Sequence, residues 1–403
     1  MSTPALPQTA TAEQGPFGIA APAGFRAAGV PAGLKSTGRP DVAVVVNDGP
    51  LKYAAAVFTS NRVAAAPVHW SRQVVSDGRA DAVVLNSGGA NACTGPEGFG
   101  NTHRTAEHAA ERLGVSAADV VVCSTGLIGV QLPMDRLLPG VDAAVEALGT
   151  GGGHDGGAAA AEAIMTTDSV PKQSGFAGTG YSIGGMAKGA GMLAPGLATM
   201  LVVLTTDAAV EPAELDRALR AATRVSFDRA DSDGCMSTND TVVLLASGAA
   251  GAPADPDEFA AGLTAVCTDL ALQLIHDAEG AAHDIAIRTF NAASEADAET
   301  VGRAVARSNL FKTAIFGQDP NWGRVLSAVG TTDAAFEPDR LNVSINGVQV
   351  CRAGGVGEDR DLVDLSGREV TVEIDLAAGD AEATIWTNDL THDYVHENSA
   401  YSS

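Results

Sequence analysis

The strongest constraint on this fold is an alternation of short β-branched runs with longer alanine-rich segments. Valine-rich runs of this length are typical of buried strands, whereas the alanine-rich segments are typical of helices. The pattern predicts a chain in which strands and helices alternate. We predict strands at 41–48, 53–60, 81–89, 119–126, 199–208, 241–248 and 283–290, and helices at 101–114, 134–149, 157–168, 211–226, 255–280 and 297–310.

Capping and breaking residues refine the predicted helices. We expect Asn101 or Thr102 to cap the first helix, because short polar side chains accept the free N–H groups of a helix start. Pro139 is expected to interrupt the second helix. The glycine-rich segment 149–157 is predicted to be a loop before the third helix.

The C-terminal part looks mostly β. A hairpin is predicted over 341–350, turning at Asn346 and Gly347, since this dipeptide favours tight hairpin turns. A second hairpin is predicted over 369–390. Mixed strands and helices favour sheets covered by helices, here with a smaller β-rich C-terminal part.

Composition excludes several classes of function. The 403 residues carry a net charge of −24, which argues against binding to nucleic acid or to anionic membranes. No apolar run approaches the roughly 18 residues that span a bilayer. The N-terminus has no secretory signal, and residues 1–15 are expected to form a flexible tail. Five separated cysteines without a CxxC pair fit a reducing compartment, so we expect a cytoplasmic protein.

The segment 188–208 joins a glycine- and proline-broken loop to an apolar strand at Thr199. One interpretation is an ordinary loop before a core strand. The other is self-cleavage between Ala198 and Thr199, by an N→O acyl shift followed by ester hydrolysis. A freed α-amine has a pKa of about 8, against about 10.4 for lysine, so it could serve as the base for its own hydroxyl. Threonine at an N-terminus is a known nucleophile–base arrangement.

An oxyanion site is the other half of such chemistry. The segment CSTGLIG at 123–129 follows an apolar strand and turns at Gly126, where a glycine lets a backbone N–H approach a reacting atom closely. Thr125 adds a hydroxyl donor. Each such donor is typically worth about 10² to 10³ in rate.

Together these motifs resemble the ornithine acetyltransferase family, the bifunctional glutamate N-acetyltransferases of arginine biosynthesis. The resemblance runs from residue 86 to residue 403. Its motifs are NSGGANACTG (86–95), CSTGLIG (123–129), AIMTTDSVPK (163–172), KGAGMLAPGLATML (188–201), DGCMSTNDT (233–241), FGQDPNWGR (316–324) and the terminal THDYVHENSAYSS.

The resemblance implies a fold, a processing event and a reaction. The fold is an α/β/β/α sandwich similar to that of self-processing N-terminal-nucleophile enzymes. Cleavage would give an α chain (16–198 after the tail) and a β chain (199–403) that form one intertwined unit, usually assembled as α2β2. Acetyl would pass from N2-acetylornithine to glutamate by double displacement, with no metal or redox cofactor. Many members also accept acetyl-CoA, and the sequence leaves open whether this chain does.

The resemblance also assigns roles to individual residues. Thr199 is the nucleophile and new N-terminus, and Thr125 and Gly126 are the oxyanion pair. Lys188 would pair with the substrate α-carboxylate, and Glu279 with an ammonium of ornithine. The remaining substrate contacts fall on Thr166 or its neighbour Thr167, with Thr166 preferred, and on Asn398 and Ser403.

Other signals were weighed against these. His392 and His396 have the i,i+4 spacing of metal ligands, but the local sequence looks poorly helical and no third ligand is evident, so we predict no metal. Cys123 is expected to be a buried thiol. Two rival functions stay open: an N-terminal-nucleophile amidase or aminopeptidase that passes the acyl group to water, and an uncut, non-enzymatic binding protein.

Overall fold

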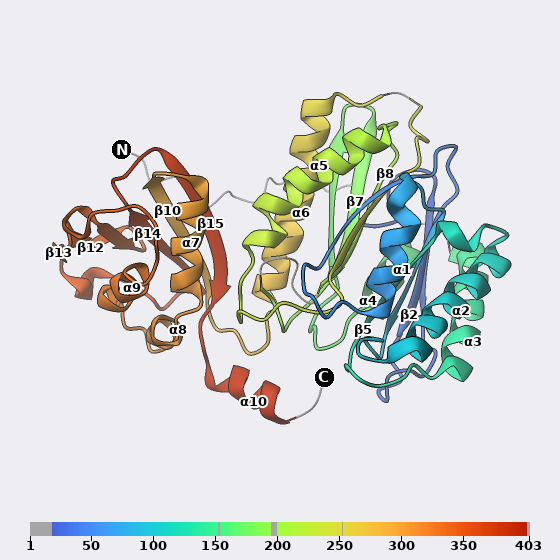
Figure 1. The fold of residues 1–403 in the computed structure, drawn as a ribbon, viewed down its shortest axis with the longest axis horizontal. Coiled ribbons are helices and arrows are strands. Elements are labelled where there is room, and N and C mark those ends of the chain that lie inside the picture. The colour runs from blue at the N-terminus through green and yellow to red at the C-terminus, as the bar shows by residue number, and fades with distance from the viewer. Residues whose placement is uncertain (1–17, 152–153, 195–199, 252, 401–403) are drawn as a thin grey trace.

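The computed structural model describes residues 18–151, 154–194, 200–251 and 253–400. It contains three sheets, two of which form a sandwich with helices on its outer faces, while the third belongs to a C-terminal unit beside the sandwich (Figure 1). Seven predicted strands lie within one or two residues of their expected bounds, which confirms the alternating pattern as the basis of the fold.

The first sheet has the strand order β1-β2-β4-β5. Its last two strands are parallel and are joined through helix α2, whereas the other neighbours are antiparallel. All residues of β2, β4 and β5 are buried, as expected for a sheet covered on both faces. The strands are β1 Phe25–Val30, β2 Val42–Asn47, β4 Ala82–Ser87 and β5 Val120–Thr125.

The second sheet has the order β3-β9-β8-β7-β6 and combines strands from both sides of the predicted cleavage point. Strands β8 and β9 are parallel, and the other pairs are antiparallel. The two halves of the chain are therefore interleaved in one hydrogen-bonded sheet. The strands are β3 Tyr53–Phe58, β6 Lys172–Gly178, β7 Tyr181–Lys188, β8 Leu201–Thr206 and β9 Thr241–Ala246.

Alternate side chains of β8 show how the layers stack. Leu201 and Val203 share a core with the first sheet, whereas Val202 and Leu204 pack in a second core with helices α5 (Pro212–Val225) and α6 (Pro256–His276). Because successive strand residues point to opposite faces, the two sheets lie face to face. The predicted α/β/β/α sandwich is confirmed. The first sheet is covered by α1 Ala66–Val74, α2 Gly95–Leu113, α3 Met134–Gly151 and α4 His154–Ala163.

The C-terminal unit is a six-stranded sheet with three helices and a core of its own. Its strand order is β13-β12-β11-β14-β10-β15, so it is rich in β structure, as predicted. The elements are β10 Asp284–Ala292, α7 Glu295–Ala306, α8 Asn309–Phe316, α9 Trp322–Val329, β11 Asn342–Ile345, β12 Val348–Arg352, β13 Gly355–Val356, β14 Glu369–Asp375 and β15 Ala381–Asn388, followed by α10 His392–Ala400.

Two predictions in this unit have different outcomes. The hairpin turn at Asn346–Gly347 is confirmed, with φ of 45° and 81° at the two residues. The second hairpin is wrong, because β10 inserts between β14 and β15 and pairs with both. Strands β14 and β15 are close in sequence, but β10, which lies between them in the sheet, comes from about eighty residues earlier in the chain. Helices α8 and α9 were also not expected.

The helix predictions need four corrections. Helix α2 begins at Gly95, with a proline in its first turn, so Asn101 and Thr102 are buried inside it and cap nothing. Helix α3 continues through Pro139. The segment 149–157 is largely helical instead of a loop, since α3 runs to Gly151 and α4 starts at His154. Helix α4 ends at Ala163, short of the predicted 168.

Helix α6 corrects the statement that no segment approaches a membrane span. By length and composition this 21-residue helix meets the usual criteria. Nine of its residues, from Phe259 to Ile275, are buried against α5 and the second sheet, so its apolar character is explained by the core.

Candidate active site

Ends of four strands meet at one edge of the sandwich. Strand β5 ends at Thr125 and β7 ends at Lys188, while β8 and β9 begin there. A cavity of about 110 Å³ lies at this edge. It is lined by Ala90, Thr125, Gly126, Ile128, Thr166, Thr167, Lys188, Gly191, Met192, Ser237, Thr238, Asn239, Glu279 and Asn398. The structure thus brings together every predicted site residue that it describes, from segments up to 273 residues apart in the chain.

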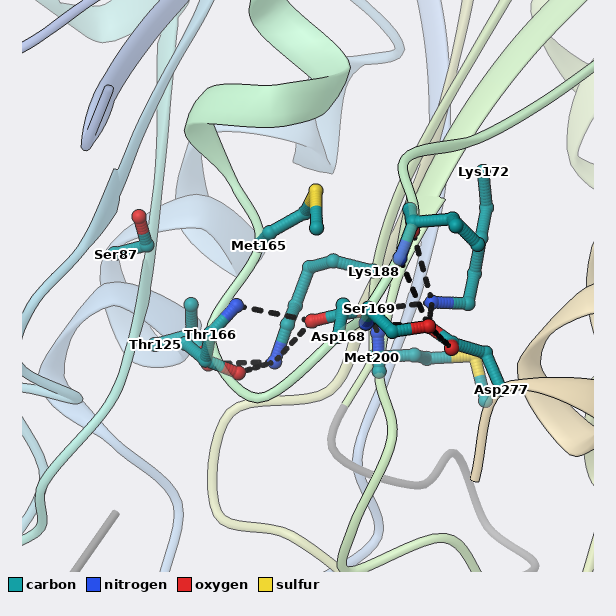
Figure 2. A network of polar contacts seen from close by, with 12 residues as sticks. Ser87, Thr125, Met165, Thr166, Asp168, Ser169, Lys172, Lys188, Met200 and Asp277 are labelled. Carbon is teal, nitrogen blue, oxygen red and sulfur yellow. Dashed lines mark hydrogen bonds and ion pairs between the residues drawn. The ribbon is translucent and has the colours of Figure 1, made fainter. Parts of the chain in front are cut away.

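Lys188 is the central cation of this site. Its side chain is 1% exposed, and its Nζ donates to Thr166 Oγ1 at 2.7 Å and to Thr125 Oγ1 at 3.3 Å (Figure 2). Burial lowers the pKa of Lys188, and the Asp168 carboxylate opposes that shift. This burial excludes a solvated surface lysine at this position.

Asp168 anchors the lysine and was not singled out from the sequence. Its carboxylate accepts the N–H groups of Thr166 at 2.9 Å and Gly189 at 2.6 Å, and lies 2.7 Å from Lys172 Nζ and 4.0 Å from Lys188 Nζ. Burial would raise the pKa of Asp168, but the two lysines and these N–H groups hold it at about 2. The TTD motif offered the signal: a carboxylate two residues after Thr166 can close a local turn.

The two threonines of this motif differ in their contacts. Both line the cavity, but only the hydroxyl of Thr166 receives a hydrogen bond from Lys188. The local turn follows the end of α4, where Asp168 accepts the Thr166 N–H. The geometry therefore links Thr166, the preferred of the two in the sequence analysis, to the central lysine.

The turn after β5 places Thr125 and Gly126 at the cavity wall. The Thr125 carbonyl accepts the N–H groups of Gly88 and Gly89, both at 3.0 Å, which ties this turn to the neighbouring strand. Gly126 has φ of 130°, and a Cβ there would lie 2.7 Å from the Gly89 nitrogen. A backbone approach this close is available only to glycine.

Glu279 faces Lys188 from the segment after α6. It is 8% exposed, and its N–H donates to the Ala190 carbonyl at 2.9 Å. A Cβ on Gly191 would lie 2.5 Å from Glu279 Oε2, so the missing side chain at 191 makes room for the carboxylate. The carboxylate and the lysine give one small cavity both signs of charge.

Asn398 reaches the cavity from helix α10, which was predicted to be poorly helical. Thr391 caps this helix, accepting the Tyr394 N–H at 2.9 Å while donating to the Gly280 carbonyl at 2.6 Å. Gly280 directly follows Glu279, so this capping residue fixes the C-terminal helix beside the carboxylate. The sequence of α10 is polar and has no apolar stripe, so it gave no indication of a helix. The helix is held by contacts with other parts of the fold.

Three predicted residues, Ala198, Thr199 and Ser403, lie outside the described residues, as does the whole of the predicted 1–15 tail. The described chain resumes at Met200. The next residue, Leu201, pairs with Lys188 across strands β8 and β7, so Thr199 precedes the strand partner of Lys188 by two residues in the sequence. Its role stays a prediction.

Sequence reasoning also missed the wall formed by 237–239. Asn239 donates from Nδ2 to the carbonyls of Ala90 at 2.6 Å and Ser124 at 2.8 Å, which joins the loop before β9 to the turn after β5. The motif STNDT marked this loop as polar, but nothing in the sequence shows which strand it faces. The loop 237–239 lines the cavity only because the two sheets stack face to face.

Several other residues that the sequence analysis considered do not line this cavity. Cys123 is a buried thiol, as expected, and burial raises its pKa to about 12. His392 and His396 lie on α10, and among the described residues no group of three potential ligands gathers around a metal position. A larger hollow of about 570 Å³ runs along β3 between α1 and α5 and contains none of the predicted residues.

The fold and the site define an α/β/β/α sandwich protein with a charged pocket where strand ends from both sheets meet. The ArgJ family matches residues 26–403. The arginine biosynthesis bifunctional protein ArgJ of Streptomyces coelicolor is 67% identical over 385 residues, covering 96% of this chain and 100% of that protein. The protein of the same name from Mycobacterium leprae is 56% identical, with 96% of each chain covered. The chain belongs to the ArgJ family.

Among solved structures, the chain is similar to the ornithine acetyltransferase of Mycobacterium tuberculosis complexed with ornithine. The identity is 55%, the TM-score is 0.44, and the match covers 47% of this chain and 98% of that chain. The recognition of the family from its motifs is confirmed by the family match and by these relatives.

Proposed function

We propose that this protein transfers an acetyl group from N2-acetyl-L-ornithine to L-glutamate through an acetyl ester on Thr199. The observation that carries the proposal is the convergence of Thr125, Thr166, Lys188 and Glu279 on one cavity beside the start of β8. The names of the relatives, which place them in arginine biosynthesis, support the same substrates.

The proposed chemistry begins with self-cleavage between Ala198 and Thr199. In the mature enzyme the Thr199 hydroxyl attacks the acetyl carbonyl, and the freed α-amine takes the hydroxyl proton. Thr125 and Gly126 stabilise the oxyanion, which is the largest single contribution in many acyl transfers. The α-ammonium gives this proton to the departing ornithine nitrogen as the C–N bond breaks. The amine of glutamate then attacks the ester and loses a proton to the α-amine, which passes it to Thr199 Oγ as N-acetylglutamate leaves.

Substrate recognition follows from the charges of the cavity. Both amino acids have an α-carboxylate, which suits the buried Lys188, and ornithine carries a side-chain ammonium, which suits Glu279. Asn398 would add a polar contact from α10, and Ser403 another from the chain end. The Mycobacterium tuberculosis relative, whose structure holds ornithine, supports this assignment.

The wider properties of the protein are part of the same proposal. The reaction conserves the acetyl group, so it needs no metal or redox cofactor. Acetyl-CoA would serve as a second acetyl donor if this chain shares the second activity implied by the word bifunctional in the names of its relatives. We propose a cytoplasmic α2β2 assembly of the cleaved chains 16–198 and 199–403.

The decisive experiment is intact mass spectrometry of the denatured protein and of Thr199→Ala. We expect the wild type to give two chains that sum to the 40.6 kDa polypeptide plus one water, the second beginning at Thr199. The variant should stay whole and inactive. Thr206→Ala, at the far end of β8, is the control and should be cleaved normally. An active Thr199→Ala protein would refute the mechanism.

The fate of the acetyl group distinguishes an amidase from a transferase. With N2-acetylornithine alone, a transferase releases ornithine slowly, because the ester waits for an acceptor. Glutamate should raise the rate and appear as N-acetylglutamate. Stoichiometric acetate at a rate independent of glutamate would establish the amidase instead.

A further inference from the structure

Lys172, the first residue of β6, is a buried cation that joins two carboxylates. Its side chain is 1% exposed, and its Nζ donates to Asp168 Oδ1 at 2.7 Å and to Asp277 Oδ2 at 2.6 Å (Figure 2). Asp168 belongs to the turn that carries Thr166, whereas Asp277 directly follows α6. Lys172 is not among the residues that line the cavity, so any influence on the substrate acts through its two partners.

Asp277 binds the same turn a second time. Its carboxylate accepts the Ser169 N–H at 2.9 Å and also accepts the Ser169 hydroxyl (Figure 2). Two residues further on, Glu279 donates its N–H to the Ala190 carbonyl at 2.9 Å. The segment 277–279 is therefore held at both ends by segments that precede the predicted cleavage point.

Buried ion pairs of this kind fix a spacing because they tolerate little displacement. Drawing Lys172 away from either aspartate would leave a poorly paired charge in a medium of low dielectric, which is costly. Lys188 Nζ lies 4.0 Å from the second oxygen of Asp168, so two lysines and two aspartates form one buried group whose charges sum to zero. We call Asp168, Lys172 and Asp277 the clamp.

The clamp connects the two groups that are proposed to recognise the acetyl donor. Lys188, which lies beside Asp168, would bind the α-carboxylate, and Glu279, two residues after Asp277, would bind the side-chain ammonium. These two groups bear on each other, because burial lowers the pKa of Lys188 while the charges of Asp168 and Glu279 oppose that shift. The spacing of the cation and the anion therefore depends on a contact outside the cavity.

We propose that Lys172 is a positioning residue that sets the length of the donor side chain that the site accepts. The inference rests on the proposed function. Lys172 and its two aspartates hold the carboxylate-binding lysine and the ammonium-binding glutamate at the spacing of ornithine. A donor with one methylene more or fewer in its side chain cannot meet both charges in this geometry. Glutamate has no side-chain ammonium and is outside this selection.

The test compares three acetyl donors, which are N2-acetylornithine, the longer N2-acetyllysine and the shorter N2-acetyl-2,4-diaminobutyrate. For each donor, kcat/KM is measured as N-acetylglutamate formation at saturating glutamate. One methylene is worth about 10-fold or more in substrate discrimination, so the wild type should prefer N2-acetylornithine by at least that factor. Lys172→Met removes the charge but keeps a long side chain, and the preference should fall to about 3-fold or less.

Asp277→Asn is a milder second variant. It removes one charge of the clamp, while its amide oxygen can still accept the Ser169 N–H and Lys172 keeps Asp168 as a partner. We expect the preference for N2-acetylornithine to fall in the same direction as in Lys172→Met.

Lys52→Met is the matched control. Lys52 also pairs with an aspartate, Asp81, at 3.7 Å. It lies at the end of the sandwich opposite to the cavity, since the neighbouring Tyr53 pairs with Ala246, the last residue of β9, and the cavity lies where β9 begins. This variant should keep the wild-type preference among the three donors.

The outcomes separate a positioning role from a structural one, and this inference from the proposed function. If both clamp variants lose kcat/KM by the same factor for all three donors, or if the wild type shows no preference among them, the inference is overturned and the proposed function stands. If the wild type forms no N-acetylglutamate from N2-acetylornithine, both fail. Should Lys172→Met not fold, as judged by thermal unfolding, Asp277→Asn decides.

Discussion

The buried charges around Asp168 lead to a quantitative prediction about stability. The pKa of Asp168 lies at about 2, against 3.8 for the unperturbed group. At about 1.4 kcal/mol per pKa unit, the charged carboxylate stabilises the folded protein by about 2 kcal/mol relative to its neutral form. Because the folded pKa is depressed, this stability is present above the unfolded pKa and is lost as pH falls from about 4 to about 2.

The assay is urea unfolding of Asp168→Asn, made in Thr199→Ala so that one uncut chain unfolds. At pH 7 we expect a loss of at least about 2 kcal/mol, since the variant also leaves buried lysine charge poorly compensated. The difference from the parent should shrink as pH falls below 4. Asp48→Asn is the control, because Asp48 pairs with Arg26 at 2.5 Å with 43% of its side chain exposed, and should cost less than 1 kcal/mol. Equal losses in the two variants at pH 7 would refute the reasoning.

Three further predictions concern the cavity. Gly126→Ala places a Cβ 2.7 Å from the Gly89 nitrogen at φ of 130°, so we expect kcat to fall by about 100-fold or more, measured as N-acetylglutamate formation. Gly191→Ala pushes the Glu279 carboxylate aside, and steady-state kinetics should show a raised KM for N2-acetylornithine with normal self-cleavage; an unchanged KM would remove Glu279 from substrate binding. Lys188→Met should raise the KM for both amino acids, whereas Glu279→Gln should affect N2-acetylornithine more than glutamate; parallel effects of the two variants on both substrates would contradict the assigned charges.

Five of the seven strands that the sequence predicted well are completely buried. Strands β2, β4, β5, β8 and β9 are buried along their whole length, and an unbroken apolar run is a local signal. Strand β7 was missed because its segment YSIGGMAK contains two glycines, which lower β propensity. Gly184 is nevertheless required there, since a Cβ would lie 2.0 Å from the Gly18 carbonyl oxygen.

The errors share a physical cause, which is that tertiary contacts override local preference. Nothing local reveals that β10 inserts between β14 and β15, since the pairing joins segments far apart in the chain. Helix α3 continues through Pro139 with Leu137 and Val141 fully buried on either side, so packing offsets the lost hydrogen bond.

The site was predicted residue by residue from motifs, but the relation between its residues was not. Thr125, Lys188 and Glu279 were assigned to different partners, and the structure adds that Lys188 already donates to Thr125 and Thr166. Asp168, whose carboxylate lies 4.0 Å from Lys188 Nζ, was not assigned a role, although it belongs to the TTD motif.

The position of this cavity follows from how the second sheet is built. Because β7 and β8 are antiparallel, the end of β7 at Lys188 lies beside the start of β8, and because β8 and β9 are parallel, the start of β9 lies there too. The start of β8 therefore lies beside the buried Lys188, and Asn239 joins the loop before β9 to the carbonyls of Ala90 and Ser124 at the edge of the other sheet. The hydrogen bonds of the second sheet, formed between strands on both sides of the cut, would keep the two products together, so cleavage would create the nucleophile without loosening the fold that positions it.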